Sequence, residues 1–136
     1  MVCTRVIDEV NDYQSAIKMT CDMLEEKGAV NKNYYPAILN NIAKYGGYFY
    51  LGKGICMPHA RTEDGAIKSG MCVLKVKKPV DFFTHKVEVF ITIAAKGEAE
   101  HFKNLHRIAA FCSDSVKMKK IKEIDDAKQL LELIGE

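Results

Sequence analysis

Apolar residues recur at helical spacing in two segments of the first third of the chain. In residues 12–27 the stripe consists of Tyr13, Ala16, Ile17, Met19, Thr20, Met23 and Leu24, and Lys27-Gly28 ends the pattern. The second segment starts at Asn33, a residue type that caps helices, and tolerates Pro36 in its first turn. Its stripe runs up to Gly46-Gly47 and contains Ile38, Leu39, Ile42 and Tyr45. We therefore predict two amphipathic helices before the first strand.

The middle of the chain is rich in β-forming residues. Residues 48–51, 55–57, 71–76 and 87–95 are predicted strands, and the last becomes continuously apolar, as in a strand covered on both faces. Three further helices are predicted over residues 100–112, 116–121 and 126–133, the last two following acidic or hydroxyl starts. Helices before and after the strands predict a layered α/β sandwich with helices flanking the sheet. No repeat or linker interrupts the pattern, so we expect one domain over residues 1–136.

Composition narrows the class of protein. The 136 residues are 48% hydrophobic and 28% charged, a globular balance, and no apolar run approaches the roughly 20 residues that span a bilayer. The net charge of +2, from 20 basic and 18 acidic residues, is too balanced for a nucleic-acid footprint. Lys75, Lys77 and Lys78 come closest to a basic cluster, but their alternation with Leu74 and Val76 favours a solvated strand face.

The cysteines and the N-terminus indicate a reducing compartment. The five cysteines are odd in number, scattered and without a C-x-x-C pair, which argues against a disulfide framework and against a zinc knuckle. The N-terminus lacks a basic region followed by a long apolar stretch. We expect a soluble, cytoplasmic protein.

A histidine and an arginine directly follow a short apolar run that ends at a proline, in Gly-Ile-Cys-Met-Pro-His-Ala-Arg (residues 54–61). Because Pro58 lacks a backbone donor, the run 51–57 should stop there and leave His59 at the end of a strand, where open α/β sheets present residues to ligands. One imidazole nitrogen can act as a nucleophile while the other is held, and the fork of Arg61 can bind phosphate oxygens. The pattern predicts a phosphoryl-transfer site; a loop histidine without a role fits the same local sequence.

The other histidines differ in their surroundings. His101 starts the helix predicted after the strand 87–95, where free amides and the helix dipole favour an anion. A neutral His101 could donate an N–H to a phosphoryl oxygen, and packing one turn before Leu105 explains its position equally well. His106, at the edge of the apolar stripe of the same helix, and His85, in a polar turn, are expected to have no role.

Two other kinds of chemistry are less well supported. Cys56 and His59 have a spacing that could hold two metal ligands, but strand alternation turns them apart and no second pair completes a tetrahedral set. A thiol nucleophile would need activation, whereas Cys56 lies in an apolar strand and reads as a small buried residue. No phosphate-binding G-x-x-x-x-G-K-[ST] loop and no G-x-G-x-x-G fingerprint occurs, so we expect neither a nucleotide cofactor nor a metal.

The segment Tyr-Phe-Tyr-Leu-Gly-Lys-Gly-Ile-Cys-Met-Pro-His-Ala-Arg, residues 48–61, followed by Thr-Glu-Asp-Gly, resembles the active-site segment of a known family. The family comprises the enzyme IIA components of the bacterial phosphoenolpyruvate-dependent sugar phosphotransferase system (PTS), in the mannitol/fructose superfamily. The Pro-His-Ala-Arg form is most similar to the ascorbate and galactitol-like branches. Residues 91–95, Glu100-His101 and the ending 124–133 also resemble the family, so the similarity covers nearly the whole chain.

The resemblance implies a mixed, five-stranded sheet and a role for each candidate. His59 would be phosphorylated by phospho-HPr and pass the group to an enzyme IIB linked to a membrane enzyme IIC, and His101 would support the phosphoryl group. Mannitol-type members carry an arginine in the preceding helix, where this chain has Ala43 and Lys44. Arg61 is the expected substitute.

On this interpretation a neutral nitrogen of His59 attacks in line, and Arg61, His101 and helix-start amides stabilise the phosphoryl oxygens. Two alternatives from other classes stay open. A regulatory module would carry the same phosphohistidine but signal to a regulator instead of an enzyme IIB. A hydrolase or thiol enzyme would use His59 as a base and act without any partner protein.

Overall fold

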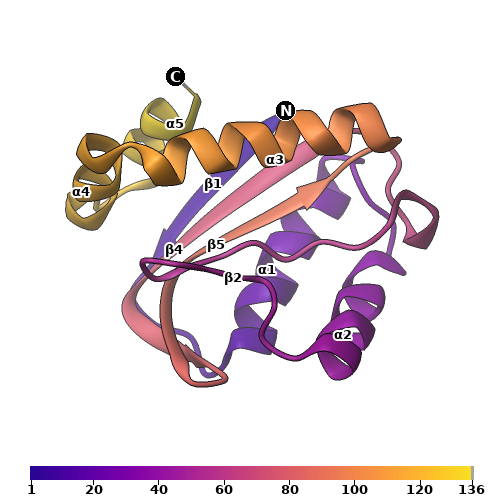
Figure 1. Ribbon diagram of the computed structural model, residues 1–136, viewed down its shortest axis with the longest axis horizontal. Helices are drawn as coiled ribbons and strands as arrows, with labels where there is room; N and C mark the ends of the chain where they lie inside the picture. Colours follow the sequence, from indigo (N-terminus) through magenta and orange to yellow (C-terminus); the bar gives the residue numbers. More distant parts are fainter. Residues whose placement is uncertain (136) are drawn as a thin grey trace.

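The computed structural model describes residues 1–135 and shows a five-stranded sheet between two layers of helices (Figure 1). In chain order the elements are β1 (Val2–Ile7), α1 (Tyr13–Glu26), α2 (Tyr34–Tyr45), β2 (Tyr50–Gly52), β3 (Ile55–Cys56), the 3-10 turn η1 (Thr62–Asp64), β4 (Gly70–Phe82), β5 (His85–Ala94), α3 (Glu98–Ser113), α4 (Ser115–Glu123) and α5 (Ala127–Gly135). No helix within residues 1–135 is long and apolar enough to cross a membrane.

The sheet is mixed, with strand order β1-β4-β5-β3-β2. β4 and β5 form a central antiparallel hairpin, β1 and β3 pair with it in parallel, and β2 pairs antiparallel with β3. The long hairpin is therefore the scaffold to which all shorter strands attach. This architecture confirms the predicted layered α/β sandwich and the mixed, five-stranded sheet.

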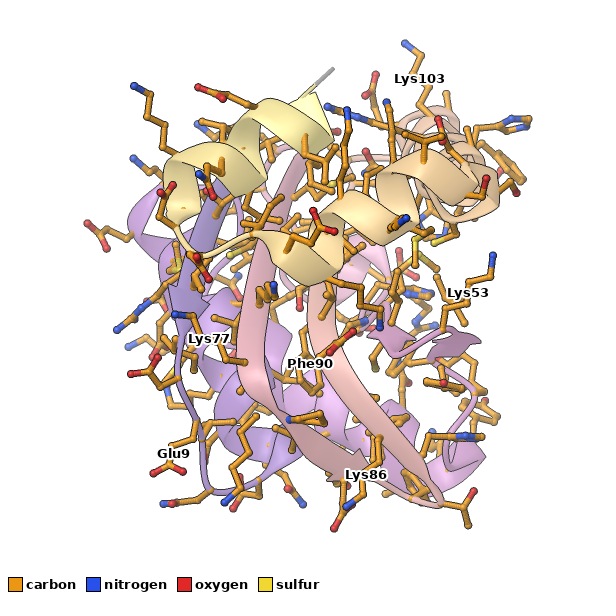
Figure 2. The ribbon with its side chains drawn as sticks, turned by 90° about the vertical axis from the view of Figure 1, so that its left-hand side faces the viewer. Glu9, Lys53, Lys77, Lys86, Phe90 and Lys103 are labelled. Atoms are coloured by element: carbon orange, nitrogen blue, oxygen red, sulfur yellow. The ribbon has the colours of Figure 1, made fainter. Side chains whose placement is uncertain are left out.

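Side chains of the central strands alternate between two hydrophobic cores. Phe90 and Leu74 face α1 and α2, where they join a cluster with Ile17 and Ile38. Their strand neighbours face the opposite layer, in a cluster with the apolar residues of α3, α4 and α5, and include Met71, Val73, Val89, Ile91 and Ile93. Figure 2 shows Phe90 inside the molecule and Lys86 projecting outward near the hairpin turn. Because the sheet is covered on both faces, its functional residues must lie at strand ends.

The five predicted helices are present, and their starts follow the expected chemistry with one exception. The Asp12 side chain accepts a hydrogen bond from the Ser15 amide at 2.7 Å, and Asp114 caps α4 in the same way. Asn33 occupies the cap position of α2, but its side chain makes no capping hydrogen bond. Its own amide instead donates to Asn31 Oδ1 at 2.9 Å, so the capping role predicted for Asn33 is wrong.

Two strand predictions are corrected. β1 was not among the strands expected from local pattern, because this edge strand, Val-Cys-Thr-Arg-Val-Ile, lacks a clear apolar alternation. The run 51–57 is not one strand: Gly52, Lys53 and Gly54 all have positive φ angles and form a turn between β2 and β3. The turn folds the segment back on itself, and β3 alone leads toward His59.

The sequence predicts that Lys75, Lys77 and Lys78 lie on a solvated strand face. This is wrong for Lys75 and right for Lys77 and Lys78. Lys75 is only 4% exposed, and its ammonium donates to the carbonyl oxygens of Lys122 and Ile124 at 3.0 and 2.6 Å. These carbonyls lie at the C-terminal end of α4, which favours a nearby cation. Lys77 and Lys78 are exposed, and Figure 2 shows Lys77 pointing outward.

Candidate functional site

His59 lies just beyond the end of β3, as the sequence predicts. Pro58 cannot donate a backbone hydrogen bond, but its carbonyl accepts one from Ile93 N near the end of β5, at 3.1 Å. The amide of Met57 donates to Phe49 O at 2.9 Å. The segment that carries His59 is therefore fixed to β5 on one side and to the chain before β2 on the other.

One nitrogen of the His59 ring is already engaged. Nδ1 lies 3.0 Å from the carbonyl oxygen of Met57. A carbonyl can only accept, so Nδ1 carries the proton, and in the neutral ring Nε2 keeps a free lone pair. The ring packs edge-on against Phe49, with 5.0 Å between centroids. Burial lowers the pKa of His59 below its usual 6.5 and His101 lowers it further, while the hydrogen bond to Met57 acts in the opposite direction.

His101 is brought to His59 by the central strand β5, whose C-terminal end lies beside that of β3 because the two strands run parallel. Its ring centroid lies 5.2 Å from that of His59, and the two rings are tilted by 50°. His101 is in the first turn of α3, where its amide donates to Gly97 O at 3.2 Å. The cap residue Gly97 offers no side chain, so the preceding amides of this turn have no side-chain cap. The predicted pairing of His59 with a histidine at a helix start is present.

Arg61 reaches the same pocket but is engaged with carboxylates. Its side chain is 72% exposed, with Nε 3.2 Å from Asp64 Oδ2 and 3.4 Å from Glu63 Oε1. This guanidinium lowers the pKa of Asp64, chiefly through their side-chain hydrogen bond. A phosphoryl group would therefore have to compete with two carboxylates for Arg61.

The three candidate residues line one open pocket of about 620 Å³, bounded by α2, the His59 segment and the start of α3. The sequence assigned no role in the site to the residues that α2 contributes, and named Lys44 only near the position of the missing arginine; these residues are Ala37, Asn40, Asn41, Lys44 and Tyr45. Lys44 follows Asn40 by four positions and Asn41 by three, and this polar stripe beside the apolar one was the available signal. Tyr45 and Tyr48 add two exposed aromatic rings to the rim.

A buried tyrosine supports the site from behind. Tyr34 is 0% exposed, and its hydroxyl accepts from the amide of Ala60 at 3.1 Å and donates to Ile93 O at 2.6 Å. One hydroxyl thus joins α2, the residue after His59 and the end of β5. In the sequence Tyr34 is an ordinary aromatic at a helix start, so only the fold reveals this contact.

The remaining histidines and Cys56 lie outside the pocket lining. His106 is exposed on α3, and His85 begins β5, where its ring stacks on Tyr50 at 3.9 Å between centroids. Cys56 is fully buried, and burial raises the pKa of its thiol, so it is not an activated nucleophile. Within residues 1–135 no group of three or more His, Cys, Asp or Glu side chains could hold a metal ion.

Comparisons with known proteins identify the family of this chain. The family described as "Phosphoenolpyruvate-dependent sugar phosphotransferase system, EIIA 2" matches residues 3–136. The ascorbate-specific PTS system EIIA component of Salmonella typhimurium (strain LT2) is 32% identical over 135 residues, which cover 96% of this chain and 87% of that protein. The solution structure of the mannitol-specific cryptic phosphotransferase enzyme IIA CmtB of Escherichia coli superposes with a TM-score of 0.88 at 27% identity, covering 97% and 90% of the two chains.

The fold also recurs in a solved assembly. The Escherichia coli complex of mannitol enzyme IIA and phosphorylated enzyme IIB has a TM-score of 0.81 at 21% identity, covering 96% of this chain and 93% of that one. Since one family matches nearly the whole chain, and a 32% identical relative and the fold agree with it, this chain belongs to the EIIA 2 family of the phosphoenolpyruvate-dependent sugar phosphotransferase system.

Proposed function

We propose that this chain is a phosphocarrier of a sugar phosphotransferase system, which accepts a phosphoryl group from phospho-HPr on His59 and passes it to a cognate enzyme IIB. One observation carries the proposal. The Nδ1 atom of His59 is held by Met57 O at 3.0 Å, which leaves Nε2 as the free nitrogen of a ring that lines an open pocket. A neutral imidazole with one oriented nitrogen is the nucleophile that phosphoryl transfer needs.

The transfer balances without a cofactor. The Nε2 lone pair of His59 attacks the phosphorus, a new N–P bond forms, and the N–P bond of the donor phosphohistidine breaks. The electron pair of the broken bond returns to the donor imidazole. Nδ1 keeps its proton and its hydrogen bond to Met57 O, so the ring does not rotate during the step. The reverse sequence delivers the phosphoryl group to enzyme IIB.

The pocket supplies groups for the phosphoryl oxygens. His101, at 5.2 Å between ring centroids, is close enough for a ring nitrogen to reach an oxygen carried by His59. The uncapped amides at the start of α3 add partial positive charge on the same side. Arg61 stabilises the transferring group by exchanging Asp64 and Glu63 for phosphoryl oxygens. Positioning and charge are thus both provided.

The proposed acceptor follows from the family. The Escherichia coli mannitol enzyme IIA forms a complex with phosphorylated enzyme IIB. We infer that an enzyme IIB, linked to a membrane enzyme IIC, docks over the pocket of this chain and receives the phosphoryl group there. A regulatory phosphohistidine module would differ only in the partner that reads the phosphoform.

Incubation with labelled phosphoenolpyruvate, enzyme I and HPr tests the proposal. We expect one acid-labile, alkali-stable phosphoryl group per chain, and none in His59→Ala. His106→Ala is the matched control, because His106 is exposed on α3 and does not line the pocket. Full labelling of His59→Ala would overturn the assignment. Subsequent transfer of the label to a purified enzyme IIB would distinguish a carrier from a regulatory module.

A further inference from the structure

The side-chain hydroxyl of Thr62 bonds to both ends of the connection between β5 and α3. Thr62 Oγ1 donates to Ala95 O at 2.6 Å and accepts from Gly97 N at 3.0 Å. Ala95 directly follows β5, and Gly97 is the cap residue of α3, with a φ of 96° that favours glycine. The side chain of Thr62 therefore bridges both ends of the three-residue connection at residues 95–97.

This bridge joins the two halves of the candidate site. Thr62 follows His59 by three positions, and Gly97 precedes His101 by four. Within residues 1–135, the two bonds of Thr62 are the only hydrogen bonds that join residues 57–65 to residues 95–101. The contacts of Pro58 and Tyr34 with Ile93 fix the His59 segment to β5, but they do not reach α3.

The start of α3 has little other support. The buried residues of this helix are Ile108 and Phe111, both in its second half. In its first half, Asn104 Nδ2 donates to Ala94 O at 3.2 Å, and Glu98 and Phe102 are exposed. Hydrophobic packing begins one turn later, at the partly buried Leu105, so the position of the first turn depends on the polar contacts of the connection.

We propose that Thr62 is a positioning residue, whose hydroxyl holds the first turn of α3 against the His59 segment and so sets the approach of His101 to the phosphoryl group. This inference rests on the proposed function of His59. It assigns Thr62 no contact with the phosphoryl group itself. The hydroxyl can make both bonds because it offers one donor and two acceptor lone pairs.

The central comparison is between Thr62→Val, which removes the hydroxyl and keeps the shape, and Thr62→Ser, which keeps the hydroxyl. We expect Thr62→Val to lower the maximal rate of transfer from phospho-HPr by about fivefold or more, the scale of one lost hydrogen bond or a small misplacement. Thr62→Ser should recover most of the rate. Thr4→Val is the matched control, since the Thr4 hydroxyl also donates to a carbonyl, Ala127 O, at 2.6 Å, but away from the pocket.

A double-mutant cycle with His101→Ala tests whether the rate loss in Thr62→Val arises through His101. If Thr62 acts through His101, Thr62→Val should cost much less in the His101→Ala background than in the parent. An equal fold-loss in both backgrounds, or a Thr62→Ser rate as low as that of Thr62→Val, would overturn the positioning role.

A measurement on the unphosphorylated protein separates this proposal from the proposed function. We expect the NMR cross-relaxation between the ring protons of His59 and His101 to weaken in Thr62→Val and to return in Thr62→Ser. If the parent accepts no phosphoryl group, the proposed function fails, whereas unchanged cross-relaxation in Thr62→Val defeats the positioning role alone. Thr62→Ala gives a second variant without the hydroxyl should Thr62→Val fold poorly.

Discussion

At the scale of single residues, the neighbours of His59 leave only one of its two ring nitrogens free. The Met57 carbonyl holds Nδ1, and burial disfavours the imidazolium. The hydrogen bond to Met57 fixes the tautomer, and burial keeps Nε2 unprotonated near neutral pH. The Pro-His motif singles out His59 as the candidate nucleophile from sequence alone, but which nitrogen is free depends on a backbone carbonyl that only the folded loop brings into place.

The lowered pKa of His59 predicts a pH dependence of stability. Below pH 6.5 the unfolded chain binds a proton at this histidine before the folded chain does, so the free energy of unfolding falls as the pH drops. In His59→Gln this contribution is absent. Urea denaturation between pH 5 and 7.5 should therefore show a shallower decline for His59→Gln than for the parent. His106→Gln serves as the control, and parallel curves for His59→Gln and the parent would contradict the buried, neutral histidine.

Both the charge of Arg61 and the planar shape of its guanidinium are predicted to contribute to the rate of phosphoryl transfer. Arg61→Ala should lower the maximal rate of transfer from saturating phospho-HPr by about tenfold or more, the scale of one charged hydrogen bond. Arg61→Lys should recover only part of this loss, because an ammonium cannot bind two oxygens with a planar fork. Single-turnover kinetics separates the effects: a change confined to apparent affinity would indicate docking, and an unchanged maximal rate in Arg61→Ala would exclude stabilisation of the phosphoryl group.

Asp64 and Glu63 compete with a phosphoryl group for the guanidinium of Arg61, and replacing one of them tests whether this competition limits transfer. Asp64→Asn removes the nearer partner of the guanidinium, at 3.2 Å, and leaves Glu63 in place. If release of Arg61 from its carboxylates limits its use, Asp64→Asn should transfer at least as fast as the parent. A slower Asp64→Asn would mean that the ion pair holds Arg61 in its working position.

At the scale of elements, prediction from sequence succeeded where local pattern dominates. The helices carry apolar residues at helical spacing, and α1, α2 and α3 end next to a glycine or at the cap of the next helix, so their existence follows from local rules. β1 and Lys75 could not be predicted in this way. β1 is an edge strand whose partner is distant in sequence, and the burial of Lys75 depends on the C-terminal end of α4 lying over it. An alternating lysine pattern describes a solvated face only when nothing covers that face.

Tyr34 links three elements, and its loss should be measurable. Tyr34→Phe removes the hydroxyl that pairs with Ala60 N and Ile93 O, which leaves buried polar groups without these bonds. We expect a loss of about 1–3 kcal/mol in the free energy of unfolding, together with slower phosphorylation of His59. Tyr35→Phe is the matched control, because its hydroxyl makes one part-buried bond to Gln14 O at 3.1 Å. Equal effects of the two substitutions would show that the Tyr34 hydroxyl has no special link to the site.

At the scale of the whole molecule, the site is assembled from segments that are far apart in the sequence. α2 supplies Asn41 and Lys44, the loop after β3 supplies His59, and α3 supplies His101. The sheet order places β3 beside β5, so the ends of these strands meet at one edge. The sequence indicated the two histidines through their strand-end and helix-start positions. It could not indicate the α2 wall, because that contact depends on how the helix packs on the sheet.

The aromatic rim of this pocket leads to a prediction about partner proteins. Tyr45 is 64% exposed, and its ring lies 5.6 Å from that of Tyr48, at the mouth of the pocket. Aromatic residues are enriched at protein-binding surfaces. Tyr45→Ala should therefore raise the apparent KM for phospho-HPr or for the acceptor enzyme IIB by about fivefold, with little change in the maximal rate or in stability.

Val116→Ala is the control for Tyr45→Ala, because Val116 is similarly exposed, at 61%, but lies on α4 and does not line the pocket. Steady-state transfer with each partner in turn shows which of them uses the rim. If one KM rises and the other does not, the two partners use different parts of the rim. If Tyr45→Ala leaves both KM values unchanged, the exposed aromatic pair takes no part in docking, and recognition must depend on the polar residues of the pocket.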